Sequence, residues 1–415
     1  GGNTGGNTGG NTGGNTGGAN AISGTVDGDR SGANGANSSV SGDDSNADGY
    51  AANVAGDRSN ANGSNAGVKG NDSNANGYTA NVTGDRSNAL GSNASVKGND
   101  SNAIGYKASV TGNRSNANGS NARIKGDDSD AHGYAANVIG NRSIANGSNS
   151  SVRGDDSNAS GYKASVVGNR SIATGSNASV KGHESNAYGY RAQVVGDGST
   201  AIGSQSTVRG NRSYAAGDKA AVVGDDSTAT GANARIEGNN AVAYGARSTA
   251  KGNDTTAVGS RASATAEGAS AYGAGARATA RNATAIGRNS VADEENTVSV
   301  GSRGAERRVT NVAAGVNDTD AVNVRQLKRQ LKDAKRKADA GTATAIAMLN
   351  STHGLDEGKN FALGAGYGNY GEGKAFGVGA TVRVTENLTT TFNVGRTSGE
   401  DEDETGYGVG MSYQW

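Results

Sequence analysis

The sequence from Phe361 to Trp415 reads FALGAGYGNY GEGKAFGVGA TVRVTENLTT TFNVGRTSGE DEDETGYGVG MSYQW. Four stretches within it alternate strictly between apolar residues and small or polar ones. Each stretch is about as long as the ~9–11 residues that a tilted strand needs to cross a bilayer. One face is apolar, with aromatic residues near the ends, and the other is rich in glycine. The pattern predicts four transmembrane β-strands that anchor the chain in an outer membrane.

The apolar face of these strands is expected to contact lipid and to form the C-terminal signal. Its predicted members are Phe361, Leu363, Tyr367, Phe376, Val378, Phe392, Tyr407, Met411, Tyr413 and Trp415. Four strands cannot close a barrel, since bacterial barrels start at about eight, and an open edge in lipid leaves backbone groups unpaired. Two chains would give an eight-stranded barrel filled by its own side chains. Three chains leave room for the preceding helices, so a homotrimer with a 12-stranded barrel is expected.

The composition excludes several kinds of partner and of site. The chain has 415 residues, 70 glycines, no proline, no cysteine and a formal net charge of zero. This balance gives no reason to expect nucleic acid as a partner, and the missing cysteines exclude disulfides and thiolate metal sites. No apolar run is long enough for a transmembrane helix. The chain opens on Gly1 without a signal peptide, so we expect a processed form of an exported protein.

A 14-residue repeat runs from about Gly35 to Ile286. Aligned on its first glycine, the unit reads G-x-x-A-x-V-x-G-x-x-S-x-A-x, as two glycine-led turns each followed by a short alternating strand. The alternation points four small residues of each unit inward; in one unit these are Ala52, Val54, Ser59 and Ala61. Two strands per turn, stacked turn on turn, predict a β-solenoid. Because so thin a roll buries little apolar area, lateral association with other copies is expected.

Neighbouring units alternate in sequence, so the full period is often two units. The tenth position runs Asp44, Arg58, Asp72, Arg86, Asp100, Arg114, Asp128, Arg142, Asp156, Arg170, Glu184. Equivalent positions of adjacent turns stack about 4.8 Å apart, which predicts a ladder of opposite charges that fixes the register. Asparagines that recur one per unit are expected to be stacked amides; they include Asn60, Asn74, Asn88 and Asn102.

A tyrosine follows the first glycine of every second unit. These residues are Tyr50, Tyr78, Tyr106, Tyr134, Tyr162 and Tyr190. One interpretation is a candidate ligand surface. The other, which we favour at this point, is that each tyrosine covers its own turn and the backbone beside it.

From Asp320 the spacing becomes helical. Apolar residues at a and d heptad places predict a trimer seam of Val324, Leu327, Leu331, Ala334 and Ala338, continued by Ala345 and Met348. The basic residues between them are expected to be solvated. A helix that narrows to alanine and glycine just before a barrel suits one that enters the lumen.

The chemistry of an enzyme or a metal site is not indicated. The three histidines, His132, His183 and His353, are too scattered for a metal site or a triad. The G-G-x-G-x-D calcium motif never recurs. We therefore expect no catalytic residue, no cofactor and no metal.

Several motifs resemble one family. They are Ala283–Gly287 (ATAIG), Asn296–Ser302 (NTVSVGS), Val309–Gly315 (VTNVAAG), Thr319–Leu327 (TDAVNVRQL) and the strands that end in Tyr413-Gln414-Trp415. With these motifs the chain resembles the trimeric autotransporter adhesins, the YadA-like family of type V secretion. The resemblance implies a left-handed parallel β-roll head, a neck, a short coiled-coil stalk and a 12-stranded barrel that assists export of the head. It also implies as partners outer-membrane lipid, the barrel assembly machinery of a Gram-negative cell, and a host matrix or cell-surface ligand.

The expected organisation is a GGNT tip at 1–18, head repeats at 19–286, a neck at 287–324, a stalk and lumen helix at 325–352, and the anchor at 353–415. The leading functional hypothesis is an adhesin displayed on the cell surface. The alternative is a self-associating or spacer protein without a specific host ligand.

Overall fold

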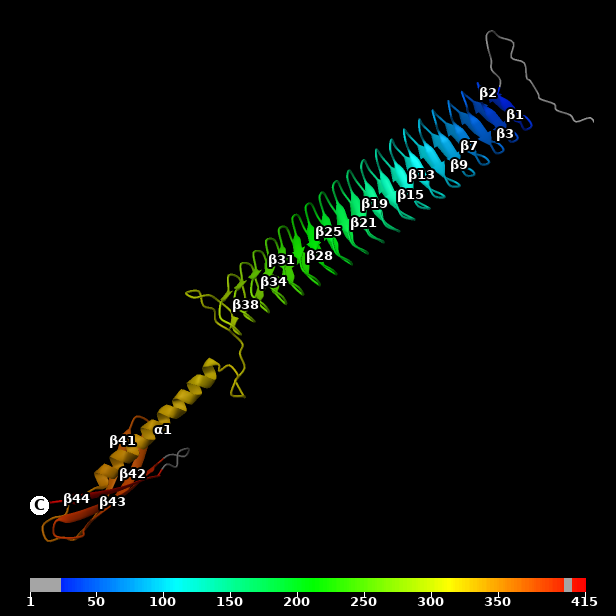
Figure 1. Cartoon of the computed structure of the whole chain (residues 1–415). Helices are drawn as coiled ribbons and strands as arrows, with labels where there is room; N and C mark the ends of the chain where they lie inside the picture. The colour runs from blue at the N-terminus through cyan, green and yellow to red at the C-terminus, as the bar shows by residue number, and fades with distance from the viewer. Residues whose placement is uncertain (1–23, 399–404) are drawn as a thin grey trace, which may run out of the picture. The chain divides into compact units, whose positions relative to one another are not determined.

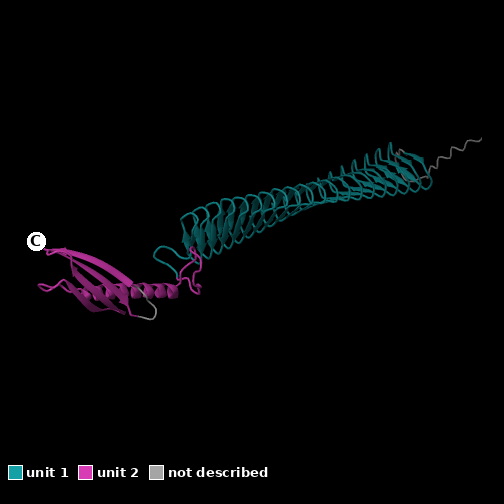
Figure 2. Cartoon of the chain, turned by 90° about the horizontal axis from the view of Figure 1, so that it is seen from below, with its two compact units in different colours: residues 1–307 teal, residues 308–415 magenta. Residues whose placement is uncertain are grey.

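The computed structural model describes residues 24–398 and 405–415. The chain divides into two compact units, residues 1–307 and residues 308–415, coloured separately in Figure 2. Each unit is described by itself. The GGNT tip predicted at 1–18 lies outside the described residues.

The first unit is a parallel β-solenoid of about 20 turns, in which each repeat unit supplies two short strands (Figure 1). Odd-numbered strands pair in parallel with the next odd-numbered strand to form the odd sheet, and even-numbered strands form the even sheet in the same way. The register step is one repeat unit throughout: Val54 pairs with Val68 in the odd sheet, and Ala61 pairs with Ala75 in the even sheet. The predicted solenoid and its period are confirmed.

The odd sheet comprises β1 Thr25–Asp27, β3 Ser39–Ser41, β5 Asn53–Ala55, β7 Gly67–Lys69, β9 Asn81–Thr83, β11 Ser95–Lys97, β13 Ser109–Thr111, β15 Arg123–Lys125, β17 Asn137–Ile139, β19 Ser151–Arg153, β21 Ser165–Val167, β23 Ser179–Lys181, β25 Gln193–Val195, β27 Thr207–Arg209, β29 Ala221–Val223, β31 Arg235–Glu237, β33 Thr249–Lys251, β35 Ser263–Ala264, β37 Arg277–Ala278 and β39 Val291–Ala292.

The even sheet comprises β2 Gly32–Asn34, β4 Asn46–Asp48, β6 Asn60–Asn62, β8 Asn74–Asn76, β10 Asn88–Leu90, β12 Asn102–Ile104, β14 Asn116–Asn118, β16 Asp130–His132, β18 Ile144–Asn146, β20 Asn158–Ser160, β22 Ile172–Thr174, β24 Asn186–Tyr188, β26 Thr200–Ile202, β28 Tyr214–Ala216, β30 Thr228–Thr230, β32 Val242–Tyr244, β34 Thr256–Val258, β36 Ser270–Tyr272, β38 Thr284–Ile286 and β40 Val298–Ser299.

The core of the solenoid is thin. Among the described residues its fully buried apolar side chains are alanines, valines and two isoleucines, Ile124 and Ile236. The four positions predicted to face inward are buried, with Ala52 and Ser59 at 0% exposure. The buried serines that precede the even strands form a column of bonds between turns. In one of them, Ser59 Oγ donates to the carbonyl of Gly70 at 2.8 Å and accepts the N–H of Ser73 at 3.1 Å. The serine column therefore joins successive turns without an unpaired polar group, which would be costly in the interior.

The charge ladder is present, with a polarity that the sequence did not reveal. Each arginine binds the carboxylate of the next turn: Arg58 Nε lies 2.6 Å from Asp72 Oδ1, and Arg58 Nη2 lies 2.7 Å from Oδ2. The hydrogen bonds from Arg58, and then its charge, hold the pKa of Asp72 below its usual value. The ion pairs of this ladder join Arg30–Asp44, Arg58–Asp72, Arg86–Asp100, Arg114–Asp128, Arg142–Asp156, Arg170–Glu184 and Arg212–Asp226. An ion pair thus joins each arginine turn to the turn after it, but not to the turn before it.

The second unit begins its regular structure with helix α1, Val324–Ser351. Asn323 caps the helix, because its side chain accepts the N–H of Gln326 at 2.9 Å. The Gln326 amide in turn bonds both backbone groups of Gly315, at 2.9 and 3.1 Å. The VNVRQL stretch is thus a helix start that also fastens the preceding loop.

Four antiparallel strands follow the helix in sequence order: β41 Phe361–Tyr370, β42 Gly373–Arg383, β43 Leu388–Thr397 and β44 Thr405–Tyr413. The sheet is open, with β41 and β44 at its edges. In the described residues no helix is long and apolar enough to cross a membrane.

Helix α1 packs on the glycine-rich face of this sheet. The buried residues of the helix are small or polar, and include Ala340, Ala343 and Ala347. A Cβ at Gly377 would lie 2.6 Å from the carbonyl oxygen of Ala347, and one at Gly368 would overlap the carbonyl oxygen of Ala343. Glycine is therefore required on this face by the close approach of the helix backbone.

The ladder makes stability depend on pH. Replacing Asp72, Asp100, Asp128 and Asp156 by Asn should lower the thermal midpoint of the full-length protein at pH 7 and low salt by a few degrees. The folded pKa values are depressed, so the contribution is complete above the unfolded pKa of about 3.9. It is lost as the pH falls through the lowered values. Circular dichroism melts at several pH values test this, and a midpoint gap that persists in strong acid would contradict it.

The glycine face gives a second test. Gly368→Val should prevent assembly of the anchor, because the added side chain occupies the place of the helix backbone. Ala365→Val is the matched control, since Ala365 lies on the same strand but is exposed on the opposite face. Oligomer on an unheated gel of outer membranes is the readout. Equal assembly of both variants would overturn the assigned packing.

Candidate functional site

The tyrosine row, the six residues Tyr50, Tyr78, Tyr106, Tyr134, Tyr162 and Tyr190, lies on the turns that lead into the odd sheet. Each tyrosine precedes a residue with a left-handed backbone, such as Ala51 with φ +51° and Lys107 with φ +55°. The turn therefore holds the aromatic side chain at the outer corner of the solenoid. The residues of the row are between 43% and 58% exposed.

Three tyrosines of the row stack with the cation that follows them. Lys107 lies 5.0 Å from the ring centroid of Tyr106, Lys163 lies 5.1 Å from that of Tyr162, and Arg191 lies 4.9 Å from that of Tyr190. Successive tyrosines are two turns apart, which is about 9.6 Å at the usual strand spacing. A serine occupies the same place on each turn between them. The row is thus a line of separate tyrosine rings, and no ring contacts the next.

The predicted amide stack is confirmed as an asparagine ladder on the outer face of the even sheet. Each side-chain N–H donates to the next side-chain oxygen, at 2.9 Å from Asn60 to Asn74 and 2.8 Å from Asn88 to Asn102. The ladder runs Asn46, Asn60, Asn74, Asn88, Asn102, Asn116 and ends on Asp130. A shallow groove of about 420 Å³ lies along it, beside Leu90 and Ile104.

The face of the even sheet is almost uncharged. Its described strands contain no lysine or arginine, and their only carboxylates are Asp48 and Asp130. Isoleucine, valine and tyrosine become frequent towards its C-terminal end, for example Ile202, Val242 and Tyr244. Such a face suits burial against other copies of the chain.

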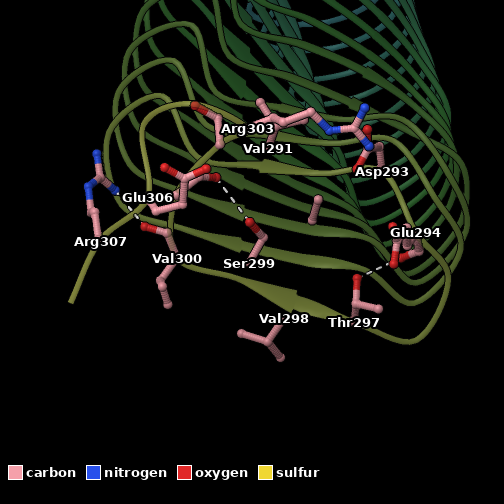
Figure 3. A pocket seen from close by; sticks show the side chains of 13 residues that line it. Val291, Asp293, Glu294, Thr297, Val298, Ser299, Val300, Arg303, Glu306 and Arg307 are labelled. Carbon is pink, nitrogen blue, oxygen red and sulfur yellow. Dashed lines mark hydrogen bonds between the residues drawn. The ribbon is translucent and has the colours of Figure 1, made fainter. Parts of the chain in front are cut away.

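A second hollow, of about 820 Å³, lies at the C-terminal end of the solenoid (Figure 3). Val298 on β40 is 66% exposed there. Arg307 spans the last turn, since its guanidinium donates to Ser290 Oγ at 2.8 Å and to the carbonyl of Val300 at 2.9 Å. The hollow therefore lies where the stack of turns ends, and Arg307 fastens the last turn to the chain that leaves the solenoid.

The ten residues predicted to face lipid are exposed in the single chain: Phe361, Leu363, Tyr367, Phe376, Val378, Phe392, Tyr407, Met411, Tyr413 and Trp415. They alternate with the glycine face that the helix covers. The sheet thus has one apolar face open and one face filled by α1.

The predicted seam residues lie on the part of α1 that precedes its contact with the sheet. Val324, Leu327 and Leu331 are 68%, 48% and 60% exposed, and Ala334 and Ala338 are exposed as well. Exposed leucines at heptad spacing have no covering partner within one chain, which is the expected state of an oligomer seam.

One buried residue of helix α1 was not identified from the sequence. Asp339 is buried at 6% exposure; its carboxylate accepts Lys335 Nζ at 3.1 Å and the N–H of Glu372 at 3.2 Å. The sequence feature that could have identified it is a single carboxylate among the small residues on one face of the helix. Asp339 thereby fastens the helix to the β41–β42 turn.

No cluster of His, Cys, Asp and Glu suited to a metal occurs among the described residues. None of the three histidines belongs to such a cluster.

Comparison with known proteins gives consistent matches. A family model described as the YadA-like membrane anchor domain matches residues 354–415, and one described as the coiled stalk of trimeric autotransporter adhesin matches residues 308–349. The YadA head domain repeat matches five segments: 153–178, 181–206, 209–234, 250–276 and 278–303. Together the three models match more than half of the chain. Residues 24–152 show the same solenoid turns although the repeat model does not match them.

Among solved structures, the chain is similar to the collagen-binding domain of the Yersinia adhesin YadA. The two are 31% identical, and the match covers 40% of this chain and 86% of that chain, with a TM-score of 0.32.

The seam is tested by charge. Replacing Leu327 and Leu331 by Asp should abolish the oligomer on an unheated gel, because like charges would meet where leucines pack. Arg329→Asp with Lys332→Asp is the matched control, as both lie outside the seam. An oligomer that survives the leucine changes would refute the heptad assignment.

Proposed function

Because the chain belongs to the YadA-like trimeric autotransporter adhesins, we propose that it attaches its cell to extended matrix proteins through the tyrosine row of its head. The chain is an outer-membrane-anchored, surface-exposed adhesin. Its binding face, its ligand and the route of its export are what we propose.

The observation that carries the proposal is the tyrosine row itself. Six half-exposed aromatic residues recur in register along one edge, and each is fixed by the backbone of its turn. Aromatic side chains are strong anchors at interfaces because they bury a large area with few rotatable bonds. A trimer displays three such rows, so many weak contacts combine by avidity.

The spacing of the row favours a particular ligand shape. Tyrosines two turns apart lie about 9.6 Å from each other. A polyproline II chain advances about 3.1 Å per residue, or about 9.3 Å for three residues. A ligand with an apolar residue at every third position can therefore meet successive tyrosines. Collagen-like matrix proteins have this conformation and this period, and aromatic grooves are a common way to bind it.

The uncharged even-sheet face is the surface we assign to contact between the three heads. The assignment leaves the odd sheet and the tyrosine row open to ligand. It also explains how a thin roll gains buried area, since the Ile, Val and Tyr side chains of the even sheet are covered on assembly.

Export of the head is proposed to use the anchor. Three open sheets with unpaired edges at β41 and β44 close into one twelve-stranded barrel, because lipid does not tolerate unpaired backbone. The glycine face around α1 supports a lumen that holds helices. Outer-membrane lipid and the barrel assembly machinery are the corresponding partners.

The proposal is tested on cells that display the full chain. Replacing all six tyrosines of the row by Ser gives every turn the residue that alternate turns already have, so the solenoid should be retained. Binding to immobilised collagen and other matrix proteins should fall by roughly tenfold or more, as avidity is lost.

The matched control replaces Ser64, Ser92, Ser120, Ser148, Ser176 and Ser204 on the same edge by Ala and should bind normally. Unchanged binding of the Tyr→Ser variant would refute the row as the ligand surface. Cells that settle in clumps while binding no matrix protein would favour self-association as the function.

A further inference from the structure

A second row runs along the odd sheet, at the last residue of every second strand from β7 to β27. It consists of Lys69, Lys97, Lys125, Arg153, Lys181 and Arg209, here called the basic row. The strand register places them in one line, since Lys69 pairs with Thr83 and Thr83 pairs with Lys97. Successive cations are therefore two turns apart, about 9.6 Å, and the row is about 48 Å long.

All six side chains are exposed, and none is among the ion pairs or side-chain hydrogen bonds of the described residues. In the turns that follow the row, the carboxylates of the charge ladder are already ion-paired: Asp100 is bound by Arg86 and Asp128 by Arg114, each at 2.6 Å. No described carboxylate forms an ion pair with a cation of the row. The six cations are thus open to a ligand outside the chain.

The row has a defined end. Two turns after Arg209 the same place is taken by Glu237, which pairs with Lys251 at 3.3 Å and with Arg235 at 3.6 Å. Beyond this point the charges on the sheet neutralise each other. Within the row, the residues between the cations are β-branched and short, such as Thr83, Ile139 and Val167, so no larger side chain rises between them.

A row of this kind cannot lie at the contact between heads. Three copies would bring like charges together, which is unfavourable, whereas the even-sheet face carries almost none. The basic row also alternates with the tyrosine row, because turns that carry a tyrosine lack the cation. The tyrosines lie before the N-terminal ends of the odd strands, and the cations lie at the C-terminal ends. A ligand can therefore bind one row without contacting the other.

We propose that the basic row binds a linear sulfated polysaccharide laid along the head. The pattern of anionic groups on such a chain repeats with each pair of sugars, and this period is close to the two-turn spacing of the cations. Arginine and lysine both bind sulfate through charge-assisted hydrogen bonds. Hydroxyl side chains of the same strands, such as Ser95 on β11 and Ser151 on β19, lie beside the row and suit the hydroxyl groups of sugars.

Duplex DNA fits the row less well. Its phosphates follow a helical path that turns away from a flat face within about half of a ~34 Å helical turn. A row of about 48 Å along one face of the sheet would contact it only in part. A flexible, extended polyanion can follow the whole row.

The experiment uses cells that display the full chain and immobilised heparin as the probe. Replacing the six cations by Gln should reduce retention on heparin by roughly tenfold or more and flatten its salt dependence, because fewer counterions are released. Matrix-protein binding through the tyrosine row should be unchanged in this variant, so failure of one proposal is distinguishable from failure of the other.

The matched control removes six cations from the opposite edge of the odd sheet by replacing Lys107, Lys163, Arg191, Lys219, Arg247 and Arg261 with Gln. It changes the net charge equally and should retain most heparin binding. Equal loss in both variants would show that net charge alone is responsible and would overturn the proposal. Equal retention on unsulfated hyaluronan would overturn the assignment to sulfate, and stronger retention on duplex DNA would overturn the assignment to a polysaccharide.

Discussion

Close contact between one glycine and the glycine of the next turn is the constraint on which the solenoid depends. A Cβ on Gly49 would lie 2.7 Å from the carbonyl carbon of Gly63, and the backbone there has φ +133°. Both facts exclude other residues. Each turn therefore rests directly on its neighbour, and each outward side chain lies over its equivalent on the turn before it. The tyrosine row, the basic row and the asparagine ladder all exist because the strand register is one repeat unit at every step.

Directional bonds compensate for the small core. Alanine and valine bury little area, so columns of serine, asparagine and paired charges supply much of the specificity between turns. A slip of one residue would put these groups against the wrong partners and expose the inward alanines, since side chains alternate between faces. Glycine has a similar role in the anchor sheet, because it lets the backbone of α1 lie directly against the backbone of the strands.

The sequence was sufficient to predict the features that repeat along the chain. The inward positions, the stacked amides, the alternating charges and the four strands each recur, and recurrence places them on one face. Features that depend on a single contact were not accessible. The arginines bind the following turn and not the preceding one because of side-chain direction, which spacing does not encode. Asp339 was missed because the partner that fastens it to the sheet, the Glu372 N–H, is a backbone group on a distant turn. The heptad pattern identified the exposed face of α1 but not the alanine face that packs on glycine.

The two-turn alternation of Arg and Asp has a consequence for how such a head changes length. Recombination that removes two repeat units leaves every arginine above its carboxylate and every column intact. Removal of a single unit keeps the backbone register. It sets either two arginines and two tyrosines, or two carboxylates and two serines, on adjacent turns, depending on which unit is lost. Length variation among natural relatives of this head should therefore proceed in even numbers of turns wherever the ladder is present, and in single turns only beyond Asp226, where it has ended.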